Sequence, residues 1–249
     1  ARKLFSRFPL EATYLSVDPD GVNINDGCGS THLGELAKAV AGGGYDLGLA
    51  FDGDADRCLA VDETGEEIDG DQIMAVCAEY LTAQGKLKSE GFVATVMSNL
   101  GLHKFCEENH LKLLCAAVGD RNVLELMQKE SMVLGGEQSG HIIFLEHMTT
   151  GDGQLAALQF LSILGQSGKK ASELAGQITH YPQLLQNIKV GSNEEKTAIL
   201  NSAELAAIVA REEEKLAGHG RILLRASGTE PLIRVMAEAD TQDLAESVV

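Results

Sequence analysis

Short apolar runs alternate between residues 12 and 164 with longer segments in which apolar residues recur every three or four positions. Short apolar runs are typical of buried strands, and the longer period is typical of amphipathic helices. Strands are predicted at 12–17, 46–51, 57–62, 92–97, 111–118, 132–136 and 141–144, and helices at 30–44, 71–85, 102–109, 121–129 and 153–164. This succession predicts an α/β fold with βαβ units on a mixed or mostly parallel sheet.

The pattern changes after residues 181–190. A charged helix at 194–216 precedes two strands, 221–225 and 231–239, which are joined by a polar loop and followed by the start of a helix at 241–249. Strands and helices in this order predict a separate small α+β domain, with its boundary near Tyr181 and Pro182.

Composition narrows the class of protein. Of 249 residues, 44% are hydrophobic and 23% are charged, which is typical of soluble globular proteins, and no apolar run is long enough to span a membrane. A net charge of −17 disfavours nucleic acid and anionic membranes as partners. An anionic ligand would therefore need local arginines.

The five cysteines predict reduced thiols. They are odd in number, share no Cys-x-x-Cys spacing and lie mostly in apolar segments, so we expect buried thiols in a cytoplasmic protein. The chain opens with Ala-Arg-Lys instead of Met, and we interpret it as a fragment.

Three carboxylates, Asp52, Asp54 and Asp56, alternate between two apolar runs. On a straight strand they would lie about 7 Å apart per step, whereas Mg²⁺ takes oxygens at about 2.1 Å. The backbone must therefore curl, which Gly53 and Ala55 make sterically easy. The pattern predicts a strand-to-strand turn that holds a divalent cation.

Other interpretations of this cluster are a solvated acidic turn and an EF-hand, because Asp52, Asp54, Asp56 and Glu63 match EF-hand positions. Against the EF-hand, Arg57 occupies the position that needs Gly, and the flanks read as strands. Arg57 itself either pairs with the acids or marks a phosphate beside the metal.

Two further loops carry candidate chemistry. The first, 135–141, offers an acceptor, a hydroxyl and an imidazole for a polyol, in Glu137, Ser139 and His141, unless it is an ordinary polar turn. The second has the composition of an anion nest with two guanidinium groups, unless it is a hairpin with surface arginines; its residues are Arg225, Ser227, Gly228, Thr229 and Arg234.

The segments Asp-Gly-Asp-Ala-Asp-Arg (52–57), Gly-Glu-Gln-Ser-Gly-His (136–141) and the loop at 225–235 resemble, in this order, the loops of α-D-phosphohexomutases. The resemblance implies a partial second α/β domain at 1–68, a third α/β domain at 69–180 and a clipped C-terminal α+β domain at 181–249. Gln138 resembles the glucosamine branch of the family more than the glucose or mannose branches.

The resemblance also implies residue roles. One Mg²⁺ would be held by Asp52, Asp54 and Asp56, and sugar hydroxyls by Glu137 and Ser139. Arg57 would be a catalytic residue beside the metal. His141 would be a candidate acid/base. The phosphate that is not being transferred would be held by Arg225, Ser227, Gly228, Thr229 and Arg234.

The family's phosphorylated serine, in a Thr-x-Ser-His-Asn-Pro-like loop, has no counterpart in this chain, because Ser30 lacks the pattern. The implied whole enzyme is an isomerase that interconverts glucosamine 6-phosphate and glucosamine 1-phosphate through phosphoserine and glucosamine 1,6-bisphosphate, in amino-sugar and cell-wall precursor synthesis. A second copy of the same protein, in a homodimer, is its candidate partner. We expect the chain alone to be inactive. The rivals are a non-catalytic sugar-phosphate or metal-binding module and a phosphatase with an aspartyl nucleophile.

Overall fold

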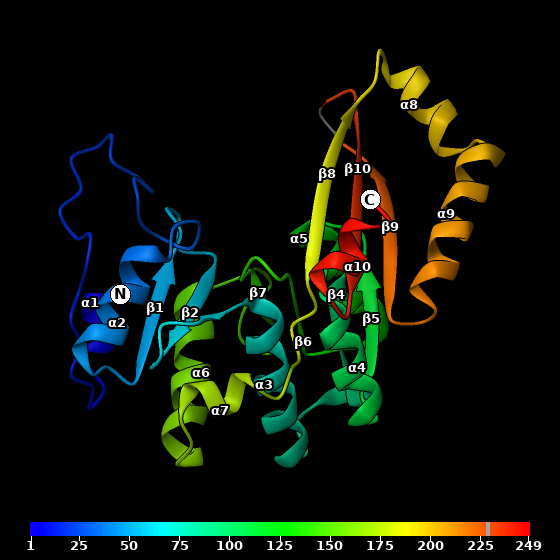
Figure 1. Cartoon of the computed structure of the whole chain (residues 1–249). Helices are drawn as coiled ribbons and strands as arrows, with labels where there is room; N and C mark the ends of the chain where they lie inside the picture. Colours follow the sequence, from blue (N-terminus) through cyan, green and yellow to red (C-terminus); the bar gives the residue numbers. More distant parts are fainter. Residues whose placement is uncertain (228–229) are drawn as a thin grey trace. The chain divides into compact units, whose positions relative to one another are not determined.

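The computed structural model describes residues 1–227 and 230–249, which form two compact units. The first unit comprises Ala1–Ser98 and Leu102–Ile178, and the second comprises Asn99–Gly101 and Thr179–Val249. Figure 1 shows the helices and strands of both units. No helix among the described residues is long and apolar enough to cross a bilayer.

The first unit opens with a three-stranded antiparallel sheet in the order β1-β2-β3. Its elements are α1 (Arg2–Phe5), α2 (Gly34–Gly43), β1 (Leu47–Phe51), β2 (Cys58–Asp62) and β3 (Glu67–Ile68). Phe51 is the register partner of Cys58, so residues 52–57 form the turn of a hairpin. The sheet therefore places the three aspartates at one end of two apolar strands.

The strand predicted at 12–17 is wrong. A strand needs a partner for its backbone groups, and no described segment pairs with these residues, which run as irregular chain. Leu15 is 40% exposed, so its side chain lies outside the core.

A four-stranded sheet in the order β5-β4-β6-β7 forms the remainder of the first unit. β4 is parallel to β5 and β6, and β7 returns antiparallel to β6, as the mixed α/β prediction requires. Its strands are β4 (Gly91–Thr95), β5 (Lys112–Ala116), β6 (Leu134–Gly136) and β7 (Ile142–Phe144); the helices are α3 (Gly70–Ala83), η1 (Lys88–Glu90), α4 (Leu100–Glu108), α5 (Asp120–Glu130), α6 (Gly153–Ser167) and α7 (Ala171–Ala175). β4 is fully buried, as expected for a central parallel strand.

All five cysteines are reduced thiols, and three of them lie in the core of this unit. Cys58, Cys77 and Cys106 are buried, whereas Cys115 is exposed and Cys28 is intermediate. The expectation of reduced thiols holds for the structure, and burial holds for three of the five.

The second unit is a small α+β fold. Its antiparallel sheet has the order β8-β10-β9, so β10 lies between the other two strands (Figure 1). The elements are β8 (Gln183–Lys189), α8 (Asn193–Leu200), α9 (Ala203–Leu216), β9 (Gly220–Ala226), β10 (Leu232–Ala239) and α10 (Gln242–Glu246).

The single helix predicted at 194–216 is two helices. Ser202 separates them, and its Oγ accepts a hydrogen bond from the Leu205 N–H, which caps the start of α9. A serine in this role offers the backbone an alternative to continuing the helix.

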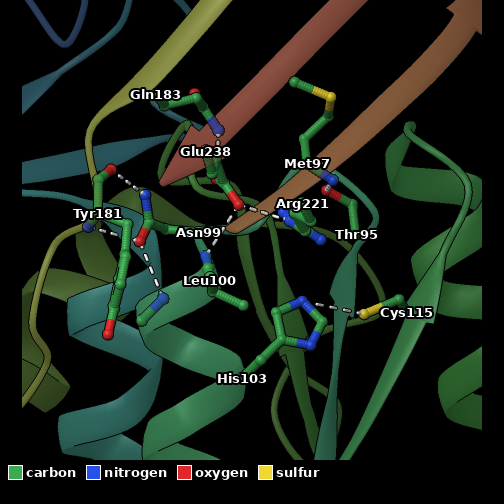
Figure 2. A network of polar contacts seen from close by, with 11 residues as sticks. Thr95, Met97, Asn99, Leu100, His103, Cys115, Tyr181, Gln183, Arg221 and Glu238 are labelled. Atoms are coloured by element: carbon green, nitrogen blue, oxygen red, sulfur yellow. Dashed lines mark hydrogen bonds and ion pairs between the residues drawn. The ribbon is translucent and has the colours of Figure 1, made fainter. Parts of the chain in front are cut away.

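A buried carboxylate organises one end of the second unit, as Figure 2 shows. Glu238 on β10 is 0% exposed and accepts hydrogen bonds from the Leu100 N–H and from the Gln183 amide, at 3.1 and 2.7 Å. Arg221 on β9 donates to the same carboxylate. Asn99 bonds both backbone groups of Tyr181, at 2.9 and 3.0 Å. These contacts explain why Asn99–Gly101 groups with the second unit.

Candidate active site

The turn between β1 and β2 brings the three aspartates together. One carboxylate oxygen each from Asp52, Asp54 and Asp56 lies within 4.8 Å of the others. That separation is only slightly larger than two Mg–O bonds of about 2.1 Å laid end to end. The curl is at Ala55, whose φ is +61°, and the Arg57 N–H donates to Asp52 Oδ1 at 3.1 Å. The predicted strand-to-strand turn is therefore present.

The donor set fits a hard divalent cation. All three groups are carboxylates, the ligand type that Mg²⁺ prefers. Asp56 Oδ1 is buried and has no hydrogen-bond partner within the described parts of the chain. A buried acceptor without a partner is rare, and a cation at this place would satisfy it.

The EF-hand interpretation does not fit the structure. The turn is flanked by strands, not by helices. Glu63, which would have to be the last ligand, accepts hydrogen bonds from the backbone N–H and the Oγ of Ser172, at 3.1 and 2.5 Å. Its carboxylate is held at the start of α7, apart from the aspartate cluster.

His141 is fixed against the aspartate turn. Its Nδ1 lies 3.0 Å from Asp56 Oδ2, and its Nε2 accepts a hydrogen bond from the Gly151 N–H at 3.0 Å. Because Nε2 is an acceptor, a neutral ring carries its proton on Nδ1 and donates it to Asp56. The residue is 3% exposed. This geometry aims the imidazole at a metal-ligand candidate.

Gly151 and Gly153 complete this cluster, and sequence analysis missed both. A Cβ on Gly151 would lie 2.6 Å from the His141 ring. The Gly153 N–H donates to the Ala55 carbonyl at 3.0 Å, and a Cβ there would lie 2.3 Å from the Arg57 carbonyl. Two glycines two residues apart before an apolar helix were the available signal, since glycine often marks a close backbone approach.

The aspartate turn and the polyol-type loop are joined by backbone. Arg57 forms an isolated β-bridge with His141, and the Cys58 N–H donates to the Gly140 carbonyl at 3.0 Å. Arg57 Nε is buried without a hydrogen-bond partner in the described part of the chain, where no ion pair joins Arg57 to the three aspartates. The salt-bridge interpretation of Arg57 therefore finds no support among those residues.

The side chains of the loop 137–141 divide between two directions. Glu137 accepts from the Gly119 N–H at 2.9 Å, and the exposed Ser139 donates from Oγ to Glu137 at 3.4 Å. Gln138 instead donates to Asp69, the N-cap of α3, at 3.1 Å. Glu137 and Ser139 thus lie together, whereas Gln138 serves the start of a helix.

The second unit holds the candidate phosphate loop. Arg225 and Arg234 are direct register partners on β9 and β10, and both are half-buried. Like charges directly opposite on an antiparallel pair repel, and a bound anion would offset the repulsion. Ser227 is buried, with its Oγ accepting from the Glu230 N–H at 3.3 Å. Gly228 and Thr229 lie outside the described residues.

Comparisons with known families agree with this architecture. Residues 69–181 match the family model described as phosphoglucomutase/phosphomannomutase, alpha/beta/alpha domain III, and residues 185–249 match that of the C-terminal domain. The chain belongs to the phosphoglucomutase/phosphomannomutase family, the α-D-phosphohexomutases.

Two curated relatives are similar to this chain over almost its whole length. The chain is 51% identical over 247 residues to the phosphoglucosamine mutase of Ligilactobacillus salivarius, covering 99% of this chain and 54% of that protein. It is 53% identical over 249 residues to the phosphoglucosamine mutase of Anoxybacillus flavithermus, covering 100% of this chain and 55% of that protein. The chain thus spans about half the length of these relatives.

A solved structure shows the same fold. Aspergillus fumigatus N-acetylphosphoglucosamine mutase, in complex with GlcNAc-6P and magnesium, superposes with a TM-score of 0.75 at 21% identity, covering 99% of this chain and 57% of that one. At this identity the likeness concerns the fold.

Proposed function

We propose that the protein to which this chain belongs is a phosphoglucosamine mutase, an isomerase that interconverts glucosamine 6-phosphate and glucosamine 1-phosphate. The observation that carries the proposal is the joining of the three-aspartate turn to the 137–141 loop through His141 and Asp56. The two bacterial relatives at 51% and 53% identity support glucosamine phosphate as the substrate.

In this proposal the chain supplies binding and orientation. Magnesium held by Asp52, Asp54 and Asp56 would add positive charge beside the transferring phosphoryl group. Arg57 has a buried guanidinium Nε to offer a phosphate oxygen. Glu137 and Ser139 would bind sugar hydroxyls.

The second unit would hold the phosphate that is not being transferred, through the loop that contains Ser227, Gly228 and Thr229. Arg225 and Arg234 would add two guanidinium forks, which match phosphate oxygens. Because the sugar phosphate reacts at either end, one fixed phosphate site serves both orientations. The division into domains at 1–68, 69–180 and 181–249 remains part of this proposal.

The role of His141 is refined by its contacts. Both ring nitrogens already have partners, Asp56 and Gly151. These contacts support a positioning role in which the ring orients Asp56. Acid/base catalysis by His141 stays a prediction.

The phosphoryl carrier is proposed to be a serine outside these 249 residues. The aspartates of the turn cannot store a phosphoryl group while they bind the metal. The chain alone, supplied with magnesium, glucosamine 6-phosphate and catalytic glucosamine 1,6-bisphosphate, should therefore show no mutase activity. Turnover by it would place the nucleophile within the chain.

The test of the full proposal is an assay of the complete reading frame that encodes these residues. Glucosamine 6-phosphate should be converted faster than the glucose or mannose phosphates, and Asp54→Asn should reduce the rate strongly. Preference for glucose or mannose phosphate would assign the protein to another branch of the family. Binding without turnover by the complete protein would favour a non-catalytic module.

A further inference from the structure

Helix α8 buries a single side chain, and that side chain is a lysine. Lys196 is 7% exposed, and the other residues of the helix are half-buried or exposed. A surface helix normally turns apolar residues inward. Where a surface helix buries a charged residue instead of an apolar one, a functional constraint is expected.

The ammonium of Lys196 lies against the candidate phosphate loop. Its Nζ donates to the Ser227 carbonyl at 2.7 Å and to the Glu230 carbonyl at 3.0 Å. These two residues stand on either side of residues 228–229, so Lys196 links both sides of the loop. An ammonium has three N–H donors, and the two carbonyls account for two of them.

Within residues 1–227 and 230–249, Lys196 forms no ion pair, and the hydrogen-bond partners of its ammonium are two neutral carbonyls. Other low-exposure charges of the second unit are paired: Glu238 with Arg221, and Glu212 with Arg211 and Lys215. A buried charge is costly unless it is paired. In a chain with a net charge of −17, a buried cation without an ion pair among the described residues is unusual, and a bound anion would compensate its charge.

We propose that Lys196 is a third cationic group of the phosphate site, a positioning residue that holds both sides of the loop and offsets the charge of a bound phosphate monoester. The inference rests on the proposed phosphate site at Arg225 and Arg234. It adds a residue that lies about thirty positions away in sequence from the loop it serves.

The test compares three variants of the 249-residue chain. Lys196→Met removes the charge and keeps the length of the side chain, Lys196→Arg keeps the charge, and Lys189→Met removes an exposed charge from the same unit. Inorganic phosphate and glucose 6-phosphate are titrated by calorimetry, well below the unfolding temperature of each variant. Separate unfolding curves identify effects on stability alone.

Lys196→Met should weaken phosphate binding by about tenfold or more, the size expected for a hydrogen bond to a charged group. Lys196→Arg should bind more tightly than Lys196→Met, and Lys189→Met should bind like the unchanged chain. If the contacts of Lys196 served stability alone, Lys196→Met would change the free energy of unfolding and leave the phosphate affinity unchanged. A folded Lys196→Met chain with unchanged affinity would therefore overturn the inference.

A second measurement does not depend on the folding of Lys196→Met. In the unchanged chain, the ε-methylene NMR signal of Lys196 should shift as phosphate saturates the site, and an unmoved signal would overturn the inference. If Arg234→Ala weakens binding while Lys196→Met does not, the inference fails and the phosphate site stands. If the unchanged chain binds no phosphate, the proposed site fails and the inference with it.

Discussion

Nδ1 of His141 lies 3.0 Å from Oδ2 of Asp56, although the two residues are 85 positions apart in sequence. The contact occupies one oxygen of the carboxylate, and the other, Oδ1, is buried without a hydrogen-bond partner among the described residues. His141 thereby orients Asp56 so that one oxygen remains for a cation. A hydrogen bond that orients a metal-ligating carboxylate in this way tunes metal affinity.

Replacing His141 with Phe should weaken metal binding to the chain by about 10–100-fold, because the ring volume is kept and the hydrogen bond to Asp56 is lost. Calorimetry with Mn²⁺ measures the affinity. The exposed His147→Phe serves as the control. Equal affinities for both variants would mean that His141 only fills space.

Asp54→Asn should weaken Mg²⁺ or Mn²⁺ binding by at least about tenfold, because a neutral amide oxygen replaces one of three charged ligands. The exposed Asp46→Asn, next to β1, changes the net charge equally and should leave the affinity unchanged. Calorimetry of both variants separates a specific ligand from the general negative field. Identical losses would contradict the assignment of Asp54.

Gly151→Ala should lower both stability and metal affinity. The added Cβ would lie 2.6 Å from the His141 ring, and overpacking of this kind costs about 1–3 kcal/mol. Gly165→Ala in α6 is the matched control, because a Cβ there has open space and alanine favours a helix by about 0.5–1 kcal/mol. Urea unfolding should therefore show opposite signs for the two variants.

Burial raises the pKa of the Cys77 thiol from 9.0 to about 12, and the pKa of Cys58 rises for the same reason. Since the folded state holds these protons more tightly, their contribution to stability is complete below about pH 9 and is lost as pH rises towards 12. Urea unfolding at pH 7 and pH 10.5 should show this loss. Cys77→Ala should make it smaller, whereas Cys115→Ala, at an exposed position, should not.

Local signals made the aspartate turn and the 137–141 loop predictable, because apolar strands on both sides identify a polar turn. The link between them was not predictable, since a pair 85 residues apart leaves no local pattern. Lys196 was missed because a lysine within a charged helix is ordinarily solvent-exposed. The false strand at 12–17 has strand-like residues and no described partner, which only the fold reveals.

Removing Arg234 should separate stability from function, because Arg234 and Arg225 are directly opposed on β10 and β9. Like charges across an antiparallel pair repel, and Arg234 Nε is buried without a hydrogen-bond partner in the described chain. Arg234→Ala should therefore leave the ligand-free protein at least as stable while weakening phosphate binding by about 1.5–3 kcal/mol. Thermal unfolding without ligand and calorimetry with glucose 6-phosphate measure the two quantities.

Arg211→Ala, on the exposed side of α9, should leave phosphate affinity unchanged. A parallel loss of stability and affinity in Arg234→Ala would show that the arginine supports the hairpin, and the anion-binding role of the pair would then be wrong.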